Sequence, residues 1–578
     1  MAGFGGSVFL ADLDADYITP SQACVNPLFN GAAKTPAESE QRVGSGSDGT
    51  TSVGTGSDRK AGAATLSIDS SIFSGIDTVT NKDQQQVARV TLNDCLACSG
   101  CVTSAETVLV TSHSISKLKE VLQSQHKGSK PLVLVLSVSP HARASIAQHY
   151  KLDLTTTKRC IEALFVNKLG FKYVFDTEGA ARVAREEVAA EFLHRLEKRE
   201  QLSRHLSSNP LANKLAWERP RDTVAISSTE ALYVDTNEKF VHSCSTDDQP
   251  VALPLLTSSC PGWICYAEKK CPEILPYIST CKSPQQILGR VVKGLIADKL
   301  VPGAAKKEIE NAPYVYHVTL MPCYDKKLEA SRKDFLYENG FPDVDLVISP
   351  KEFLDMLVAD GIEFDKMQDE GKTGNGDDVL KANEVKKFLG YSGDPVTVSQ
   401  YDTSRSGSSG GYLDFTLRTT ALKKFGLNLF DNKQILTFKS GRNKDFKVTE
   451  IQHEGQVVLR FAIAYGFRNI QAIMRQIKKG NCRYDFIEIM ACPSGCLNGG
   501  AQLVAENRIL TKAVLEKVKS LYDNHVVWDG YKEQVKMSDA FYKIFGFHPY
   551  TKHSIKAFHT TYHSVAELKL ENSMGGDW

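Results

Sequence analysis

Short apolar runs alternate with amphipathic stretches through most of this 578-residue chain. Buried strands are predicted where β-branched and other apolar residues follow one another with little polar interruption. Such runs occur at 132–138, 173–175, 251–256, 314–320, 344–348 and 484–489. A helix is predicted over about 180–198, directly after the second run. This alternation is typical of parallel sheets covered on both faces, so the sequence predicts an α/β fold.

Three polar stretches interrupt the pattern. From about Lys34 to Ala64 the chain is mostly Gly, Ser, Thr and Asp, which bury too little apolar surface to become ordered. We expect a flexible tether there, while Asp369–Asp378 and Ser404–Gly411 are predicted to be surface loop insertions. The tether lets residues before it reach distant sites, because the entropic cost of closing a loop rises only with the logarithm of its length.

Composition narrows the class of protein. The chain is longer than one core usually holds, and its formal charge of +1 gives no global attraction to nucleic acid or anionic membranes. No run approaches the roughly 20 apolar residues of a spanning helix, and the start does not resemble a secretory signal. We therefore expect a soluble, unsecreted protein, in which 14 cysteines indicate reduced thiols and metal rather than disulfides.

The motif Cys95-Leu-Ala-Cys98-Ser-Gly-Cys101 spaces three cysteines so that one loop can wrap three corners of an iron–sulfur cluster. A four-iron cluster takes four thiolates, but Ala105 stands where bacterial ferredoxins place their next cysteine. Cys24, on the far side of the tether, is the candidate fourth ligand. The alternatives are a zinc site, a three-iron cluster with Cys24 free, and a water ligand.

A second set of cysteines is spread along the chain. Cys260, Cys323 and Cys492 each follow within a few residues of a predicted strand. The carboxyl ends of parallel strands border the crevice where open sheets bind ligands, so these thiols can converge there. Cys496 adds a fourth thiol four residues after Cys492.

Two prolines indicate where helices begin next to cysteines of this second set. Pro261 and Pro493 directly follow cysteines and predict the first position of a helix. A helix N-terminus offers free N–H groups and positive potential, which suit an anionic cluster. The alternative is that these are four buried core cysteines, which are common in α/β proteins.

The segments around the second set resemble the three signatures of iron-only hydrogenases. They read Thr257-Ser-Ser-Cys260-Pro-Gly-Trp263, Met321-Pro-Cys323-Tyr-Asp-Lys326-Lys-Leu-Glu329 and Glu488-Ile-Met490-Ala-Cys492-Pro-Ser-Gly-Cys496-Leu-Asn-Gly499-Gly500. The resemblance runs from about Pro131 to Val565. It implies that Cys260, Cys323, Cys492 and Cys496 hold a cubane cluster between two α/β lobes, and that the last would bridge to a two-iron catalytic unit.

Departures from the hydrogenase pattern argue against hydrogen chemistry. Ser259 stands where hydrogenases carry a proton-relaying cysteine, and a hydroxyl is a poorer relay because its pKa is far higher. The ending of the third signature becomes Gly499-Gly500-Ala501-Gln502-Leu503, and His141 replaces a small pocket residue. The pocket residues Met321, Lys326, Glu329 and Met490 are retained.

This combination of matches and departures resembles the eukaryotic Nar family, also called nuclear prelamin A recognition factor-like. The resemblance implies two 4Fe-4S clusters, one on Cys24, Cys95, Cys98 and Cys101 and one on Cys260, Cys323, Cys492 and Cys496. It also implies a role in cytosolic iron–sulfur protein assembly without catalysis. In that role the chain would link cluster scaffold proteins to the targeting complex that serves apoprotein clients. The expected location is the cytoplasm, and the nucleus is a second compartment in which the chain could also work.

The expected architecture is iron-only-hydrogenase-like, with two lobes of parallel sheet flanked by helices and a cluster in the cleft. We expect five regions: an N-terminal segment with one ligand (1–33), a flexible linker (34–85), a ferredoxin-like cluster region (86–127), the hydrogenase-like body (128–505) and a small-subunit-like region with the tail (506–578). A shallow first cluster on a tether would suit transfer, and a deep second cluster would suit a structural or electron-storing role.

The chain ends Gly576-Asp577-Trp578. A terminal Trp with a free carboxylate is a compact docking anchor, and we expect it to contact a WD40-type subunit of the targeting complex. Gly576 departs from the aliphatic residue usual there, and an uninvolved, frayed terminus is the alternative.

Other cysteines and one histidine receive structural interpretations. Cys265 and Cys271 are predicted core thiols of a helix, and His559 is predicted to satisfy a structural hydrogen bond. Two functional alternatives stay open at this point: an active iron-only hydrogenase or other redox enzyme, and a binding adaptor whose clusters serve only stability.

Overall fold

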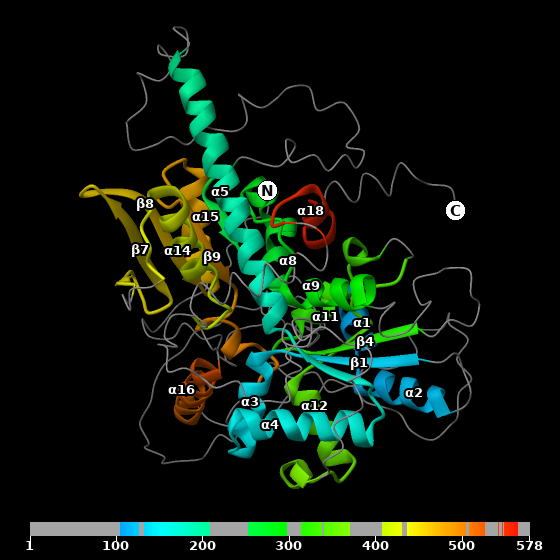
Figure 1. The fold of residues 1–578 in the computed structure, drawn as a ribbon. Helices are drawn as coiled ribbons and strands as arrows, with labels where there is room; N and C mark the ends of the chain where they lie inside the picture. Colours follow the sequence, from blue (N-terminus) through cyan, green and yellow to red (C-terminus); the bar gives the residue numbers. More distant parts are fainter. Residues whose placement is uncertain are drawn as a thin grey trace, which may run out of the picture.

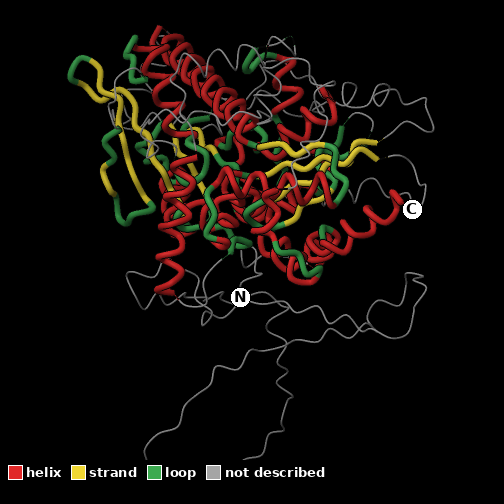
Figure 2. Tube along the Cα trace, turned by 60° about the horizontal axis from the view of Figure 1, so that its bottom comes forward, coloured by secondary structure: helices red, strands yellow, loops and turns green. Residues whose placement is uncertain are grey.

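The computed structural model describes residues 104–126, 132–208, 252–296, 314–337, 340–369, 407–430, 436–503, 508–525, 542, 546 and 548–564. The strands fall into two groups that form the centres of two lobes (Figure 1, Figure 2). The expected N-terminal segment, tether, cluster motif and C-terminal Trp lie outside the described residues.

The first lobe is built on a sheet of four parallel strands. In spatial order these are β2 (Tyr173–Asp176), β1 (Leu132–Val138), β4 (Tyr314–Leu320) and β5 (Leu346–Ile348). The predicted runs at 132–138 and 314–320 match β1 and β4 at both ends. Continuous apolar sequence is what a parallel strand with two covered faces requires, so these two predictions are confirmed.

Helices cover both faces of the first sheet (Figure 1). On one face lie α3 (Pro140–Tyr150), α4 (Leu154–Glu162) and α12 (Pro350–Ala359), and on the other α9 (Pro284–Arg290) and α11 (Asp325–Ala330). The sequence fixes several helix starts. Ser349 and Glu352 form a reciprocal capping box around Pro350, and the Asp153 carboxylate accepts two backbone N–H groups at the start of α4. The helices α1 (Ser104–Ser112) and α2 (Ile115–His126) precede β1.

The second lobe has a mixed sheet of five strands. Their order is β3 (Leu255–Thr257), β9 (Phe486–Met490), β8 (Gln456–Tyr465), β7 (Phe446–His453) and β6 (Lys439–Ser440). The first three strands are parallel, whereas β7 pairs with β8 and β6 with β7 in antiparallel fashion. The predicted strand at 251–256 is confirmed only at its end, because Pro254 has no N–H to donate to a ladder.

The β7–β8 hairpin was not predicted. Its turn consists of Glu454 and Gly455, which both have positive φ. The usual sequence signal of such a turn is Asn-Gly or Asp-Gly, and here only its glycine, Gly455, is present, so the signal for this hairpin is weak. The hairpin projects from one side of the molecule (Figure 2).

Four helices and a short C-terminal helix complete the second lobe and its junction with the first. They are α8 (Pro261–Lys270), α14 (Tyr412–Phe425), α15 (Phe467–Lys478), α16 (Arg508–His525) and α18 (Lys552–Phe558). Short 3-10 or π-helical segments occur at Ala163–Lys168, Pro272–Tyr277, Val291–Ile296, Lys333–Phe335, Phe364–Asp369 and Gly495–Asn498. Across the described ranges, none of the helices combines the length and apolar character that a membrane crossing requires.

One long helix connects the lobes. The helix α5 (Glu178–Ser208) begins directly after β2 and runs along the second lobe, as Figure 1 shows. Its 31 residues span about 46 Å. The predicted helix at 180–198 is therefore confirmed but is shorter than the observed one. Arg195, fully buried, pairs with Glu191 at 2.6 Å and donates to the carbonyls of Ala252, Pro276 and Ile278, which fixes the helix to the second lobe.

Candidate metal centre

Three cysteines of the second set follow the ends of parallel strands. Cys260 comes three residues after β3, Cys323 three residues after β4, and Cys492 two residues after β9. One of these strands belongs to the first lobe and two to the second. The carboxyl edges of the two sheets therefore bring these cysteines to the junction of the lobes, as the sequence predicted.

Cys260 is the N-cap of α8, and Pro261 occupies the first helical position. The prediction of a helix start at Pro261 is confirmed. The Ser258 hydroxyl accepts the Cys260 backbone N–H at 3.1 Å, and backbone N–H groups of Ala491 and Trp263 lower the pKa of the Cys260 thiol. Such donors stabilise a thiolate, which is the form that binds metal.

The prediction of a helix start at Pro493 is wrong. Residues 492–494 form a turn, and a short 3-10 helix begins only at Gly495. Ser494 and Gly495 both have positive φ, which an α-helix cannot accommodate. The turn brings Cys492 and Cys496 to the same place, and the Cys492 carbonyl accepts the Gly495 N–H at 3.1 Å.

The four thiols influence one another electrostatically, so they lie close together. Burial raises the pKa of Cys260 to about 12 and holds the pKa values of Cys323 and Cys492 well above the ordinary range. Neighbouring thiolates add to this: Cys496 acts on Cys260 and Cys492, and Cys260 and Cys492 act on Cys323. Cys260 is buried and the other three cysteines are partly buried. Four neighbouring thiolates would repel one another, so a cationic centre is needed for all four to be deprotonated together.

The donor set fits a four-iron cluster. Four cysteines from two lobes match the ligand number of a cubane, in which each thiolate binds a different iron atom. Within the described ranges, no three His, Cys, Asp or Glu side chains are placed to share a single ion. With a cluster bound, Cys260, Cys323, Cys492 and Cys496 would hold it, and it would supply one-electron redox chemistry.

A buried carboxylate lies beside these thiols. Asp325, which is 1 % exposed, is the largest electrostatic contributor that raises the pKa of Cys260 and Cys323. It packs so closely on α8 that a Cβ added at Gly262 would lie 3.1 Å from its carboxylate oxygen. The sequence signal for Asp325 was its place two residues after Cys323, but the residue was not singled out.

Ser259, the departure from the hydrogenase pattern, faces the site. The hydroxyl oxygens of Ser258 and Ser259 both lie 3.9 Å from the Met490 sulfur, and the Cys496 sulfur lies 4.0 Å from that sulfur. A side-chain hydrogen bond from Ser259 lowers the pKa of Cys496. A hydroxyl therefore stands where the resemblance would place a relaying thiol.

Lys326 also acts on the site, and its charge lowers the pKa of Cys496 and Cys323. Its ammonium group pairs with Glu329 at 2.9 Å, and the same carboxylate oxygen accepts hydrogen bonds from Ser283 and Gln285. This network fixes a positive charge next to the cysteines. Met321, expected in the pocket, is 3 % exposed and belongs to a small apolar cluster with Ala330.

His141 lies at the junction on α3. Its ring lies against the Tyr522 ring, tilted by 30° with 4.6 Å between the centroids, and its Nδ1 lies 3.2 Å from the Ser139 hydroxyl. Burial lowers the pKa of His141 to about 4, so the imidazole is neutral near pH 7. An uncharged, bulky ring therefore stands where the hydrogenase pattern has a small residue.

The loop prediction for Ser404–Gly411 is wrong in its described part. Residues 407–411 enter the interior, and the Ser409 hydroxyl, 2 % exposed, accepts the Cys496 backbone N–H at 3.0 Å. Gly and Ser are small enough to pack tightly beside a turn, although the same composition also occurs in flexible linkers. Composition alone could not separate these two cases.

The remaining predicted residues are accounted for as follows. His559 lies 2.7 Å from the Thr280 hydroxyl and 3.3 Å from Glu187, so its structural interpretation is confirmed. Cys271 is buried and Cys265 is partly buried in or next to α8. The first cysteine set, Cys24, Cys95, Cys98 and Cys101, lies outside the described residues.

Comparisons with known proteins find a matching family model, related sequences and related structures. The family model described as iron only hydrogenase large subunit, C-terminal domain, matches residues 132–229 and 224–500. A rat protein named cytosolic iron-sulfur assembly component 3 is 36% identical over 90% of this chain and 88% of its own length. Protein NAR1 of Arabidopsis thaliana is 32% identical over 100% and 99%.

The chain belongs to the Nar family of iron-only-hydrogenase-like proteins. A further Nar relative, the cytosolic Fe-S cluster assembly factor narfl of Xenopus tropicalis, is 35% identical over 98% of both chains. Among solved structures, a variant of the FeFe-hydrogenase HydA1 from Chlamydomonas reinhardtii matches with a TM-score of 0.55 at 24% identity, covering 78% of this chain and 98% of its own. The two-lobed hydrogenase-like fold predicted for this Nar protein is thus confirmed for its described body.

Proposed function

We propose that this chain is an iron–sulfur protein of cytosolic iron–sulfur protein assembly and that it carries two 4Fe-4S clusters. The observation that carries the proposal is the meeting of four cysteines, one buried and three partly buried, at the junction of the lobes in a Nar-family chain. Relatives at 35–36% identity carry names of cytosolic iron–sulfur assembly components or factors. The second cluster is proposed to bind Cys260, Cys323, Cys492 and Cys496.

The first cluster is proposed to bind Cys24, Cys95, Cys98 and Cys101. The five regions predicted from the sequence are retained as the proposed domain organisation. The chain would work in the cytoplasm, with the nucleus as a further compartment. Its partners would be scaffold proteins, client apoproteins and a WD40-type subunit of the targeting complex, the last reached through Trp578. Supporting observations are the cysteine motif and the terminal Trp in the sequence.

We further propose that the chain lacks hydrogenase activity. Ser259 provides a hydroxyl at the position of a relaying thiol, and its oxygen lies 3.9 Å from the Met490 sulfur next to Cys496. His141 adds a neutral ring near Lys326, whose charge helps to lower the pKa of that ring. A rival function as a hydrogenase is favoured by the fold of the solved neighbours. Infrared bands of iron-bound CO and CN, together with hydrogen evolution, would establish the rival instead.

The test compares Cys492→Ser, Cys24→Ala and Cys160→Ala, the last removing a buried thiol in the core of the first lobe. Anaerobically purified wild type should contain about eight irons, and each ligand variant about four. In cells that depend on the variant, an unrelated cytosolic iron–sulfur enzyme should lose activity with both ligand variants but keep it with Cys160→Ala. Normal enzyme activity with Cys492→Ser would contradict an assembly role for the second cluster.

A further inference from the structure

Glu488 is a buried carboxylic acid in the strand that leads to Cys492. It lies in β9, is 1 % exposed, and accepts hydrogen bonds from the Tyr465 hydroxyl at 2.6 Å and the Leu413 backbone N–H at 2.8 Å. Both hydrogen-bond donors are neutral. The charged and titratable groups that face it come from β8, α14, α5 and the cysteine turn, and are Tyr465, Tyr412, Asp414, Arg185 and Cys496.

Hydroxyl groups connect this acid to the cysteines. The Tyr465 hydroxyl, which donates to Glu488, also has a side-chain hydrogen bond with Ser409. The Ser409 hydroxyl accepts the Cys496 backbone N–H and has a side-chain hydrogen bond with the Cys496 thiol. Glu488, Tyr465, Ser409 and Cys496 thus form a continuous polar chain.

The backbone is adapted to keep this chain short. Gly495 has a φ of +77°, and a Cβ added there would overlap the hydroxyl oxygens of Ser408 and Ser409 and lie 3.1 Å from the Tyr465 ring. Only glycine lets the turn that carries Cys496 approach the two hydroxyls so closely. The close approach places the acid where it senses charge at the cysteine site.

We propose that Glu488 takes up a proton when the four-cysteine site gains an electron. This inference rests on the proposed binding of a cluster by Cys260, Cys323, Cys492 and Cys496. One electron comes from an external one-electron reductant and reduces one ferric iron to ferrous, and one proton from water converts the Glu488 carboxylate to the acid. The buried region then gains no net charge, which a low-dielectric interior favours.

The acid is suited to change its protonation state near neutral pH. Burial raises the pKa of Glu488 to about 7, although the hydrogen bonds from Tyr465 and Leu413 oppose this rise. An added negative charge at the site raises the pKa further. Proton uptake on reduction therefore follows from the geometry together with the sign of the new charge.

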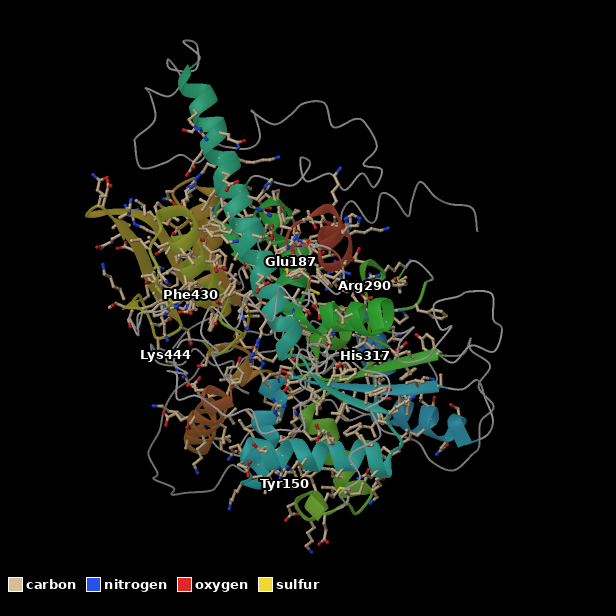
Figure 3. All side chains as sticks on the ribbon, viewed as in Figure 1. Tyr150, Glu187, Arg290, His317, Phe430 and Lys444 are labelled. Carbon is tan, nitrogen blue, oxygen red and sulfur yellow. The ribbon has the colours of Figure 1, made fainter. Side chains whose placement is uncertain are left out.

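A matched acid in the same molecule provides the control. Glu187 of α5 is fully buried and accepts hydrogen bonds from the Tyr542 hydroxyl at 2.8 Å and the Tyr550 backbone N–H at 2.7 Å. The thiol that lies near Glu187 is Cys281, which is not a proposed cluster ligand. Figure 3 labels Glu187 on α5, and its carboxylate accepts a hydrogen bond from Ser554 of α18. Both acids are buried and accept hydrogen bonds from a tyrosine hydroxyl and a backbone N–H, but Glu187 also accepts one from the Ser554 hydroxyl at 3.1 Å and lies 3.3 Å from the His559 imidazole. The difference that the control uses is their relation to the proposed site.

The experiment is an anaerobic redox titration with dithionite, followed by paramagnetic resonance at pH 6 to 8.5. The signal of the second cluster is the one lost in Cys492→Ser. In wild type, its midpoint potential should fall by up to about 59 mV per pH unit above pH 7, because one proton then accompanies one electron. Glu488→Gln should abolish this slope, and Glu187→Gln should retain it.

Infrared difference spectra provide a second readout that does not depend on the slope. Reduction of wild type should produce the carbonyl band of a protonated carboxyl, absent in Glu488→Gln, and Tyr465→Phe should shift its frequency. A pH-independent potential in wild type, or an unchanged slope in Glu488→Gln, would overturn the inference and leave the proposed cluster intact. Absence of any reducible signal that depends on Cys492 would instead overturn the proposed function.

Discussion

Asp343 in the first lobe and Glu488 in the second are both buried carboxylates, but they have different partners. Asp343 is fully buried and lies 3.4 Å from the Lys282 ammonium and 3.2 Å from the Arg290 guanidinium. Burial raises the pKa of Asp343, while the two cations oppose the rise. Glu488 instead accepts hydrogen bonds from two neutral donors, and the charges of Asp414 and Arg185 act on its pKa in opposite directions.

The difference separates two uses of buried charge. In the first lobe, the carboxylate joins α9 to the segment before β5, and a Cβ added at Gly289 would overlap the Asp343 carbonyl. The Lys282 backbone also donates to the Phe558 carbonyl, so the ion pairs hold several segments together. In the second lobe, a carboxyl held by neutral donors can change its charge without losing its hydrogen bonds.

The two lobes can differ in this way only if they meet at the cysteine site. Gly499→Val should disrupt that junction, and we expect it to have the largest effect on iron content and stability. A Cβ at Gly499 would overlap the Pro322 carbonyl directly before Cys323. The turns that carry Cys323 and Cys496 would have to separate. We expect nearly complete loss of the iron bound by the second cysteine set, and destabilisation by more than about 3 kcal/mol, since overpacking alone costs about 1–3 kcal/mol.

Gly426→Ala is the matched control for this substitution. Gly426 has a φ of +67° and nothing within 4 Å of an added Cβ, so only backbone strain opposes the change. The cost should be about 1 kcal/mol with full iron content. Equal iron loss in both variants would show that the Gly499 effect is general instability and not separation of the cysteine turns.

Asp343→Ala tests the structural role of charge in the first lobe. The substitution leaves Lys282 and Arg290 buried next to an uncharged methyl group, which should cost about 3–5 kcal/mol of unfolding free energy. The exposed pair of Lys366 and Glu363 supplies the control, because Glu363→Gln should leave the unfolding free energy nearly unchanged. Denaturant unfolding measures the loss of unfolding free energy in both variants. Similar losses would contradict a stabilising role of the buried ion pairs of Asp343.

How much of this arrangement the sequence predicts depends on the type of information required. The strands before Cys260, Cys323 and Cys492 were predictable, because parallel strands have continuous apolar sequences. Their carboxyl ends lie at the edge of the sheet where ligands bind, so the position of the cysteines was predictable too. The second lobe was predicted less well. The Glu454–Gly455 turn adds an antiparallel hairpin that breaks the simple alternation of strand and helix.

The residues that surround the four cysteines were not predictable by the same reasoning. Asp325 is two residues from Cys323, yet nothing in its local sequence shows that its carboxylate acts on Cys260 as well. Ser409 lies in a Gly- and Ser-rich stretch whose composition suggests a surface loop, and only the positive φ of Gly495 lets it reach Cys496. Contacts of this kind depend on the packing of segments far apart in the chain.

The smallest expected effect concerns the pH dependence of stability in the second lobe. The folded-state pKa of Glu488, about 7, lies above the ordinary glutamate value of 4.5, so the folded protein binds one more proton than the unfolded chain between these pH values. Stability should therefore be greatest below pH 4.5 and fall by up to about 3 kcal/mol as pH rises through 7. Glu488→Gln should remove this pH dependence of stability.

Hydrogen exchange of the β9 amides in oxidised protein at pH 5 and pH 8 measures the local opening free energy. Parallel pH dependence in wild type and Glu488→Gln would mean that Glu488 does not titrate in this window, and its contrast with Asp343 would disappear.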